Sequence, residues 1–281
     1  TYKHALTPSR MPKKLLVVGS GAIGIEFASF YNTLGADTTV IEVVDRILPA
    51  EDAEIAAFAL KQFSKQGMKI LTNASVKKVE RKKNSAHVEI VSEGKTKTEQ
   101  FDTIISAVGI VGNIEGLGLE NLSIKTDKTH IKTDNNCNVG IDGIFAIGDV
   151  AGAPWLAHKA SHEGVMVAEI IAGKHTHPVD PSSIAGCTYC HPQIASVGLT
   201  EEEANKKGLK VKIGRFPFIG NGKAIAMGEQ EGLIKTIFEA KTGELLGAHM
   251  VGAEVTELIQ GYVLGQKLET TEEDLISTVF P

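Results

Sequence analysis

Apolar residues recur with two different periods along the first 45 positions. Residues 14–19, KLLVVG, form a short continuous apolar run, which is typical of a strand buried on both faces in a parallel sheet. From Ala22 to about Leu34, apolar residues recur every three or four positions, which predicts a helix that Gly35 ends. The residues of this stripe are Ile23, Phe27, Phe30 and Leu34. Residues 38–42, TTVIE, predict the next strand, so the three elements form a β-α-β unit.

A second helix and a block of strands follow this unit. The helix is expected over about residues 51–66, with Gly67 closing it. Its apolar face consists of Ile55, Ala59 and Phe63. Strand-like segments come next, at residues 68–71, 74–81, 86–91 and 97–101. Residues 102–109, DTIISAVG, are an apolar strand that runs into a glycine, and the whole pattern predicts a Rossmann-like α/β domain with an antiparallel insertion over residues 1–112.

The pattern changes twice more before the end of the chain. Residues 143–150, GIFAIGDV, look like an apolar strand ending in Gly-Asp, and helical periodicity returns at 158–172. Residues 177–183, HPVDPSS, are a candidate linker. We therefore expect a central region over 113–176 and a third domain over 177–281.

The third domain is predicted to be an α+β domain with an antiparallel sheet. Its long strands are expected at residues 188–198, 210–218, 232–240 and 245–252, with a KTGE hairpin turn before the last strand. Helices are expected at 255–266 and 269–280, the second with Thr270 and Glu273 at capping-box spacing. Strands followed by helices fit an α+β architecture.

Composition narrows the possible partners. The 281 residues fit two or three domains, and the net charge of −5 with no basic block argues against a nucleic-acid partner. No run of 18 apolar residues and no apolar signal-peptide core near the first residue are found, so we expect no membrane partner and a cytoplasmic location, or the mitochondrial matrix for a eukaryotic source. The three cysteines argue against a disulfide framework.

Cys187 and Cys190 lie in CTYCH, the spacing of a c-type haem attachment site. That chemistry would require export, for which no signal is visible. A redox or metal-binding pair is a second alternative, and a pair of structural cysteines in a strand is the third. The alternating apolar residues of TYCHPQIASVG favour the structural interpretation, and we predict no metal site.

Residues 19–24, GSGAIG, carry the G-x-G-x-x-G motif between a predicted strand and a predicted helix. Gly19 would permit the tight turn, Gly21 would let the backbone approach a pyrophosphate, and Gly24 would let the helix pack close to the sheet. The helix N-terminus offers N–H groups and a positive dipole to phosphates. The motif therefore predicts a dinucleotide site, with a glycine turn lacking a ligand as the alternative.

Glu42 ends the next predicted strand, 18 residues after Gly24. A carboxylate there accepts hydrogen bonds from a ribose 2′-hydroxyl and repels a 2′-phosphate, which favours NAD or FAD over NADP. Arg46 could offset that repulsion if it folded back, so NADP remains an alternative. Glycine spacing alone does not choose between NAD and FAD.

Residues 143–164, GIFAIGDVAGAPWLAHKASHEG, resemble the second flavin-binding motif of the two-dinucleotide disulfide oxidoreductases. The resemblance extends over essentially the whole chain and is strongest to the members that oxidise dihydrolipoamide with NAD through FAD and a redox disulfide. It includes the segments GAIGIEFASFYNTLG, SAVGIVGN, CTYCHPQIASVGLTE and EEDLISTVFP. It implies that the glycine motif at 19–24 is the NAD site and that FAD belongs to a separate domain, whose second part is the central region 113–176. It also implies that residues 177–281 are the interface domain, through which the homodimer forms.

The resemblance also implies which residues contact each cofactor. For FAD, Asp149 would bond the ribityl chain, and the segment along the flavin ring would be Trp155, Leu156, Ala157 and His158. For NAD, the implied residues are Gly19, Ser20, Gly21, Ala22, Ile23, Gly24, Ile25, Glu26, Glu42, Val76 and Gly109. Val76 would flank the adenine, and Gly109 would lie near the nicotinamide half.

The resemblance implies a partner for Glu26 and is incomplete after Gly109. Glu26 matches a carboxylate near the flavin and nicotinamide that pairs, in the family, with a lysine outside this sequence. Buried without that lysine, it should have a raised pKa, whereas the alternative is an exposed glutamate in the first helical turn. The family's arginine and proline after the VG of SAVG are replaced in GIVGN by Ile110 and Gly112, so contacts through that arginine are in doubt.

Further expectations concern the parts of the family pattern that this sequence does not contain. In the family, an FAD domain with a C-x4-C redox disulfide precedes the NAD domain, and a His-Pro segment bearing the catalytic His and its partner Glu follows STVFP. We therefore expect no catalytic residue here beyond the auxiliary Glu26, and a chain that is inactive alone but keeps the NAD site and homodimer interface. Lipoyl domains of 2-oxo acid dehydrogenase complexes are the implied partners.

Two other functions stay open at this point. The chain could derive from another member of the family, such as a mercuric or glutathione reductase, although no arginine-lined phosphate site replaces Glu42. It could also be a nucleotide-binding or dimerisation module without a redox half.

Overall fold

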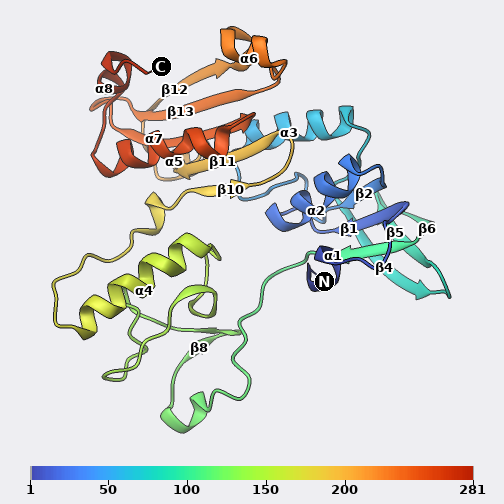
Figure 1. The fold of residues 1–281 in the computed structure, drawn as a ribbon, viewed down its shortest axis with the longest axis horizontal. Coiled ribbons are helices and arrows are strands. Elements are labelled where there is room, and N and C mark those ends of the chain that lie inside the picture. The colour runs from blue at the N-terminus through green and yellow to red at the C-terminus, as the bar shows by residue number, and fades with distance from the viewer. Residues whose placement is uncertain (1, 281) are drawn as a thin grey trace. The chain divides into compact units, whose positions relative to one another are not determined.

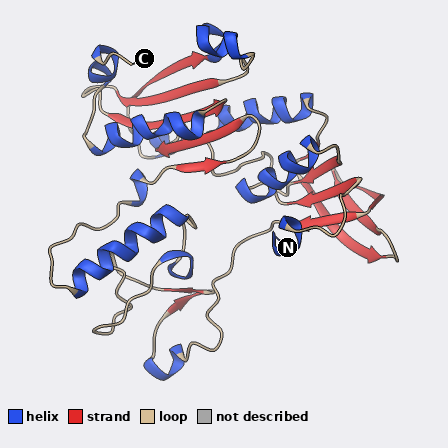
Figure 2. Cartoon of the chain, viewed as in Figure 1, coloured by secondary structure: helices blue, strands red, loops and turns tan. Residues whose placement is uncertain are grey.

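The computed structural model describes residues 2–280, which form two compact units (Figure 1). The first unit combines the described residues up to Val108 with those from Ala185 onward, and the second comprises Gly109–Ile184. Thr1 and Pro281, the outer limits of two predicted domains, lie outside the described residues. Helices and strands alternate along the chain from Tyr2 to Leu71. Figure 2 distinguishes the helices, in blue, from the strands, in red.

The first unit begins with a four-stranded parallel sheet in the order β3-β2-β1-β7. Its strands are β1 (Lys14–Val18), β2 (Asp37–Ile41), β3 (Lys69–Leu71) and β7 (Thr103–Ser106). The helices of this region are α1 (Tyr2–Leu6), α2 (Ala22–Thr33) and α3 (Ala53–Lys65). The antiparallel insertion consists of β4 (Ala74–Arg81), β5 (Ala86–Ser92) and β6 (Lys95–Phe101). The predicted α/β fold with an antiparallel insertion is confirmed.

The apolar stripe that located α2 does not face the core. Ile23, Phe30 and Leu34 are exposed. The buried face of the helix is instead made of Gly24, Ile25, Ala28, Ser29 and Tyr31. Small residues on this face let the helix axis approach the sheet closely, so the large apolar residues lie elsewhere on the helix. In α3, by contrast, the predicted face of Ile55, Ala59 and Phe63 is fully buried.

The same unit contains a five-stranded antiparallel sheet in the order β10-β11-β14-β13-β12. Its strands are β10 (Gly186–Thr188), β11 (Gln193–Gly198), β12 (Val211–Pro217), β13 (Leu233–Glu239) and β14 (Leu245–Gly252). Its helices are α5 (Glu201–Lys206), α6 (Gly222–Met227), α7 (Val255–Lys267) and α8 (Glu272–Ser277). One face of the sheet packs on α7, while Ile194, Leu233 and Val251 on the other face share a core with α2 and α3.

The predicted capping box at the start of α8 is wrong by one residue. Thr271 and Asp274 form the box, with the Asp274 carboxylate 2.8 Å from the Thr271 amide. The reason is tertiary, because the carbonyl of Thr270 accepts a hydrogen bond from Leu245 at the start of β14. Thr270 is therefore tied to β14, while Thr271, which forms an isolated bridge with Glu244, caps the helix.

The second unit has little regular sheet. It contains short 3-10 turns at Leu119–Leu122, Gly148–Ala151 and Pro181–Ser183, the two-residue strands β8 (Thr126–Asp127) and β9 (His130–Ile131), and α4 (Ala157–Ile171). The strand predicted at 143–150 is wrong: within it, Phe145 makes one isolated bridge to Asn138. An apolar run specifies burial, and here it is buried by loops and by α4 rather than by neighbouring strands.

Candidate dinucleotide-binding site

The glycine loop of residues 19–24 joins β1 to α2 at the carboxyl edge of the parallel sheet. Gly19 has φ +98°, and a Cβ there would lie 2.6 Å from the Ala107 carbonyl oxygen, after β7. A Cβ on Gly24 would lie 1.9 Å from the Gly19 oxygen. A Cβ on Gly21 would meet nothing within 4 Å. Two glycines are therefore required by packing, whereas Gly21 faces open space of the kind a ligand would need.

The N-terminus of α2 points toward that open space. Gly21 is the N-cap residue, with φ −66° and ψ 179°, and among residues 2–280 no side chain caps it. Ala22 and Ile23 in the first turn are exposed. The first N–H groups of a helix without a side-chain cap, together with the helix dipole, form a site for an anion such as a pyrophosphate.

Glu42 lies directly beside the loop because β1 and β2 are adjacent. Its Oε2 accepts hydrogen bonds from the Ser20 amide at 2.9 Å and from the Ser20 hydroxyl at 2.7 Å. Its Oε1 accepts from the amides of Val43 at 2.7 Å and Val44 at 3.1 Å. Burial raises the pKa of this carboxyl, but these hydrogen bonds outweigh burial and leave the pKa below its ordinary value.

A ribose can reach Glu42 only by replacing one of these donors. The carboxylate has about four acceptor positions, and all of them are used. The Ser20 hydroxyl is the donor that rotation alone can move away, so a ribose hydroxyl would take its place. Arg46 does not fold back onto Glu42, because its guanidinium bonds Glu202 at 3.3 Å and the Pro49 carbonyl at 3.2 Å. The fit therefore favours a free 2′-hydroxyl over a 2′-phosphate.

The remaining predicted NAD residues are placed as follows. Ile25 is fully buried in the core of the unit. Val76 is half-buried on β4 beside a bulge and packs against the cluster that contains Leu16 and Ile41. Gly109 is exposed at φ +69° and belongs to the second unit.

Glu26 is not a first-turn glutamate, since α2 begins at Ala22 and its first turn contains no acidic residue. Its Oε1 accepts a hydrogen bond from the Tyr189 amide at 2.9 Å, and burial raises the pKa of its carboxyl despite that bond. Ser29 on the same helix accepts from the His191 amide at 3.0 Å. Both contacts join α2 to the loop between β10 and β11.

The predicted flavin residues lie together in the second unit. Asp149, Trp155, Ala157 and His158 are exposed, and Leu156 is the N-cap of α4. The Trp155 indole N–H donates to Nε2 of His130 at 3.1 Å. These two rings border a cavity of about 520 Å³ within the unit. Of the predicted flavin residues, Trp155 lines this cavity, whereas Asp149 and residues 156–158 are not part of its lining. The exposed Asp149 carboxylate could bond a ribityl chain, and the N-terminus of α4 could face the flavin ring.

Sequence reasoning missed a buried ion pair that holds the Asp149 turn. Lys159 and Glu163 of α4 lie 3.0 Å apart, and both are buried. Glu163 accepts from the Gly148 amide at 2.7 Å, and Lys159 donates to the Gly152 carbonyl at 3.2 Å. The pair therefore fixes the residues on both sides of Asp149. The spacing of four residues in AHKASHEG was the signal that could have identified it.

The cysteines of CTYCH pack in different hydrophobic clusters, Cys187 with α7 and Cys190 with α2 and α3. Burial raises the pKa of both thiols, which disfavours the reactive thiolate. This geometry favours structural cysteines, but the single strand predicted at 188–198 is wrong, because Cys190 lies in the turn between β10 and β11.

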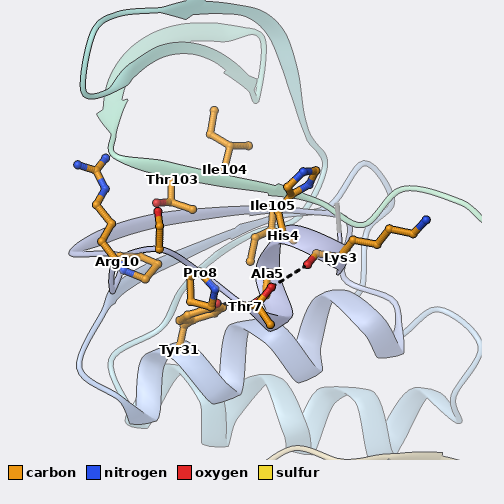
Figure 3. Close-up of a pocket in the computed structure, with 12 residues that line it drawn as sticks. Lys3, His4, Ala5, Thr7, Pro8, Arg10, Tyr31, Thr103, Ile104 and Ile105 are labelled. Atoms are coloured by element: carbon orange, nitrogen blue, oxygen red, sulfur yellow. Dashed lines mark hydrogen bonds between the residues drawn. The ribbon is translucent and has the colours of Figure 1, made fainter.

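Three basic residues, Lys3, His4 and Arg10, are among those that line a cavity of about 370 Å³ near the N-terminus (Figure 3). The side chains of Lys3 and Arg10 point away from each other, and Arg10 donates to the Asn84 carbonyl at 3.4 Å.

The parallel sheet, glycine loop and strand-end acid, followed by a separate antiparallel domain, define a pyridine-nucleotide-binding oxidoreductase architecture. Family comparison agrees: residues 1–164 match the pyridine nucleotide-disulphide oxidoreductase family, and residues 184–281 match the dimerisation domain of the same family. The chain belongs to the pyridine nucleotide-disulphide oxidoreductases, and its third part is their dimerisation domain.

Individual relatives are consistent with this assignment. The chain is 58% identical to a dihydrolipoyl dehydrogenase of Rhizobium etli and 54% identical to one of Zymomonas mobilis, over its full length in each case. It spans 59% and 61% of the length of these relatives. Among solved structures, LpdA of Mycobacterium tuberculosis has a TM-score of 0.89 at 27% identity, covering 97% of this chain and 59% of that one. The flavoprotein disulfide reductase RclA of Escherichia coli has a TM-score of 0.89 at 25% identity, covering 98% and 63%.

Within residues 2–280, no helix combines the length and the apolar character needed to cross a membrane.

Proposed function

We propose that this chain is the nicotinamide-nucleotide and dimerisation part of a dihydrolipoyl dehydrogenase. The reaction is the oxidation of dihydrolipoamide by NAD through FAD and a redox disulfide. The observation that carries the proposal is the geometry at Ser20, Gly21 and Glu42, where a buried ionised carboxylate lies beside an open, glycine-lined helix N-terminus. Relatives that are 58% and 54% identical bear that enzyme name.

Each of the chain's own residues has a defined task in this proposal. The loop of residues 19–24 holds the pyrophosphate of NAD, and Glu42 accepts the hydroxyls of the adenosine ribose. Val76 flanks the adenine, while Glu26 and Gly109 border the nicotinamide half. Asp149 holds the ribityl chain of FAD, and the segment 155–158 lines the flavin ring. The bound cofactors supply the hydride chemistry, which protein side chains alone do not provide.

The partners follow from the same assignment. Residues 184–281 supply the homodimer contact, since they match a dimerisation domain. The same domain has a cavity of about 330 Å³ that is bordered by Phe216, Met227 and Leu258. Lipoyl domains of 2-oxo acid dehydrogenase complexes are the proposed substrates, and the cytoplasm is the proposed location.

Isothermal titration of the intact protein with NADH and NADPH tests the cofactor assignment. We expect NADH to bind and NADPH to bind at least about tenfold more weakly, because a 2′-phosphate would face the ionised Glu42. Turnover with NAD and dihydrolipoamide tests the reaction. Equal affinity for the two nucleotides, or no turnover by an intact flavin-loaded dimer, would contradict the proposal.

A further inference from the structure

Residues 43–52, here called the 43–52 loop, leave the nucleotide site and end at the dimerisation domain. At one end, the Val43 and Val44 amides bond Glu42, and the Leu48 amide donates to the Ser20 carbonyl at 2.9 Å. At the other end, Asp52 is the N-cap of α3 and accepts from the Glu54 amide at 3.0 Å. The loop therefore connects Glu42 directly to the start of α3.

Lys235 of β13 holds the far end of this loop from the dimerisation domain. Its ammonium lies 2.9 and 3.0 Å from the two oxygens of Asp52, and its side chain is 3% exposed while that of Asp52 is 2% exposed. Glu201 of α5 approaches the same ammonium to 2.6 Å, and Glu54 of α3 approaches it to 3.2 Å. One buried cation therefore joins acids from two domains.

The cluster has a second cation, but it contacts only the partly exposed acids. Arg215 of β12 bonds both oxygens of Glu54, at 2.8 and 2.9 Å, and lies 3.7 Å from Glu201. Asp52 is bonded by Lys235 and by backbone amides. Removing the Lys235 charge would therefore leave the buried Asp52 carboxylate without a directly bonded cation among residues 2–280, which is a strongly unfavourable state.

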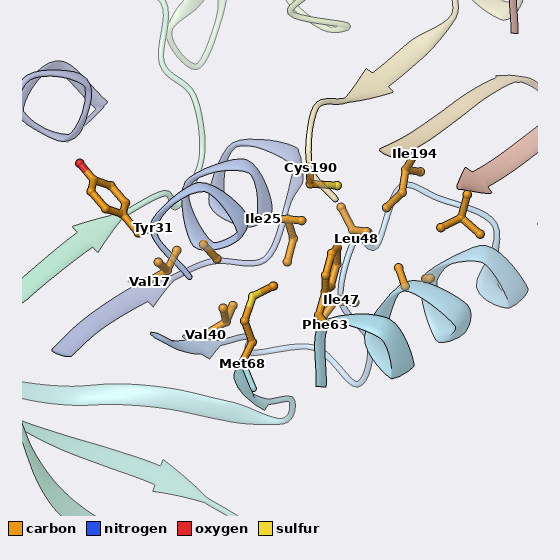
Figure 4. Packing of buried hydrophobic residues seen from close by; sticks show 14 of the residues in the cluster. Val17, Ile25, Tyr31, Val40, Ile47, Leu48, Phe63, Met68, Cys190 and Ile194 are labelled. Atoms are coloured by element: carbon orange, nitrogen blue, oxygen red, sulfur yellow. The ribbon is translucent and has the colours of Figure 1, made fainter. Parts of the chain in front are cut away.

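The middle of the loop is held in a conformation that it would not adopt alone. Leu48 has φ +47°, in the left-handed region that residues other than glycine seldom adopt. Its side chain and that of Ile47 are buried between Ile25 of α2 and Ile194 of β11 (Figure 4). Packing from both domains therefore fixes the Leu48 amide that bonds Ser20.

We propose that Lys235 is a positioning residue for the nucleotide site: by fixing Asp52, it holds the 43–52 loop so that Leu48, Val43 and Val44 present their amides to Ser20 and Glu42. The inference rests on the proposed NAD site at residues 19–24. It differs from a purely structural role, in which the cluster would join the two domains without affecting nucleotide binding.

The test uses the intact, flavin-loaded protein with Lys235→Met, which keeps an aliphatic side chain and removes the charge. Lys212→Met is the matched control, because Lys212 is on the neighbouring strand and pairs with Glu272 at the surface. We expect the NADH dissociation constant of Lys235→Met to rise at least about fivefold, the lower end of ordinary coupling between sites. The control should bind NADH like the parent.

A second variant and a second readout keep the test decisive if Lys235→Met folds poorly. Asp52→Asn retains a helix N-cap but removes the carboxylate charge, so it should weaken NADH binding in the same direction. Amide hydrogen exchange without nucleotide should accelerate in a peptide covering 43–52 in either variant, and not in the Lys212→Met control.

The outcomes separate this inference from the proposed function. If the parent protein fails to bind NADH, the proposed site is wrong, and exchange in the 43–52 loop still tests whether Lys235 positions it. If the parent binds NADH and both variants bind it equally well, with only a lower thermal midpoint, Lys235 is structural and the inference is overturned. Unchanged exchange in the loop overturns it as well.

Discussion

Gly24 and Gly21 lie in the same motif, yet the structure assigns them different physical roles that substitution can separate. In Gly24→Ala, the new Cβ would lie 1.9 Å from the Gly19 carbonyl oxygen and 2.9 Å from its carbonyl carbon. Both contacts are with main chain at the end of β1, so no side chain can rotate away. The oxygen contact must open by more than about 1 Å to become tolerable, which moves α2 away from the sheet.

The expected loss of stability follows from these distances. Overpacking of a core typically costs about 1–3 kcal/mol and occasionally more, and a clash with main chain belongs at the upper end. Alanine offsets about 1 kcal/mol through its better helix propensity. We therefore expect the free energy of unfolding to fall by about 2 kcal/mol in Gly24→Ala. Urea unfolding followed by far-ultraviolet circular dichroism measures this value.

Gly21→Ala is the matched control for packing and the real test of ligand binding. A Cβ at this position meets nothing within 4 Å, and φ −66° suits alanine, so stability should change by less than about 1 kcal/mol. NADH affinity should nevertheless fall at least about tenfold, because the methyl group would occupy the space of the pyrophosphate. Unaltered stability of Gly24→Ala, or NADH binding by Gly21→Ala at the parent level, would refute the reasoning.

Four further outcomes are expected. Glu42→Ala should weaken NADH binding about tenfold, because the hydrogen bonds to the ribose are lost. It should also reduce the preference for NADH over NADPH in competition titrations, because the carboxylate no longer repels the 2′-phosphate. Glu163→Gln should lower the flavin content of the purified intact protein, read from its visible absorbance, whereas Glu169→Gln on the same helix should not. Lysines 69 and 97 lower the pKa of Glu99 to about 2, so Glu99→Gln should cost about 1–3 kcal/mol at neutral pH, and this difference should shrink as the pH falls from about 4.5 through about 2. The 281-residue chain alone should bind NADH without oxidising dihydrolipoamide, because it has no cysteine pair at C-x4-C spacing.

Features with a local signal could be predicted from the sequence. The continuous apolar run of β1 and the buried face of α3 follow from periodicity alone, and both are present. The glycine loop could be located because its strand, turn and helix are consecutive. Even there, periodicity identified α2 but assigned the wrong face, because close packing on the sheet selects Gly24 and Ala28 rather than large apolar residues.

Features that depend on distant partners could not be predicted in this way. Lys235 and Asp52 are 183 positions apart, and neither belongs to a recognisable motif. The capping box of α8 moved to Thr271 because Leu245 bonds the Thr270 carbonyl. The sequence motif also predicted that Glu42 bonds a ribose. It gave no indication that Ser20, Val43 and Val44 already donate hydrogen bonds to that carboxylate. In each case, a tertiary contact decides which local option the chain adopts.

Ser20 connects these local and distant features, and its position has a thermodynamic consequence. Its amide and hydroxyl bond Glu42, while its carbonyl accepts from Leu48 in the loop that Lys235 holds. A ribose that displaces the Ser20 hydroxyl therefore acts on a residue that is hydrogen-bonded to the 43–52 loop, and this loop contacts the dimerisation domain through Asp52. Because coupling between two binding equilibria is reciprocal, whatever factor the Lys235 contact contributes to NADH affinity, bound NADH must contribute to the docking of that domain. The nucleotide should accordingly slow hydrogen exchange at β13 as well as at the glycine loop, and it should lose its effect on β13 when Lys235 is replaced by methionine.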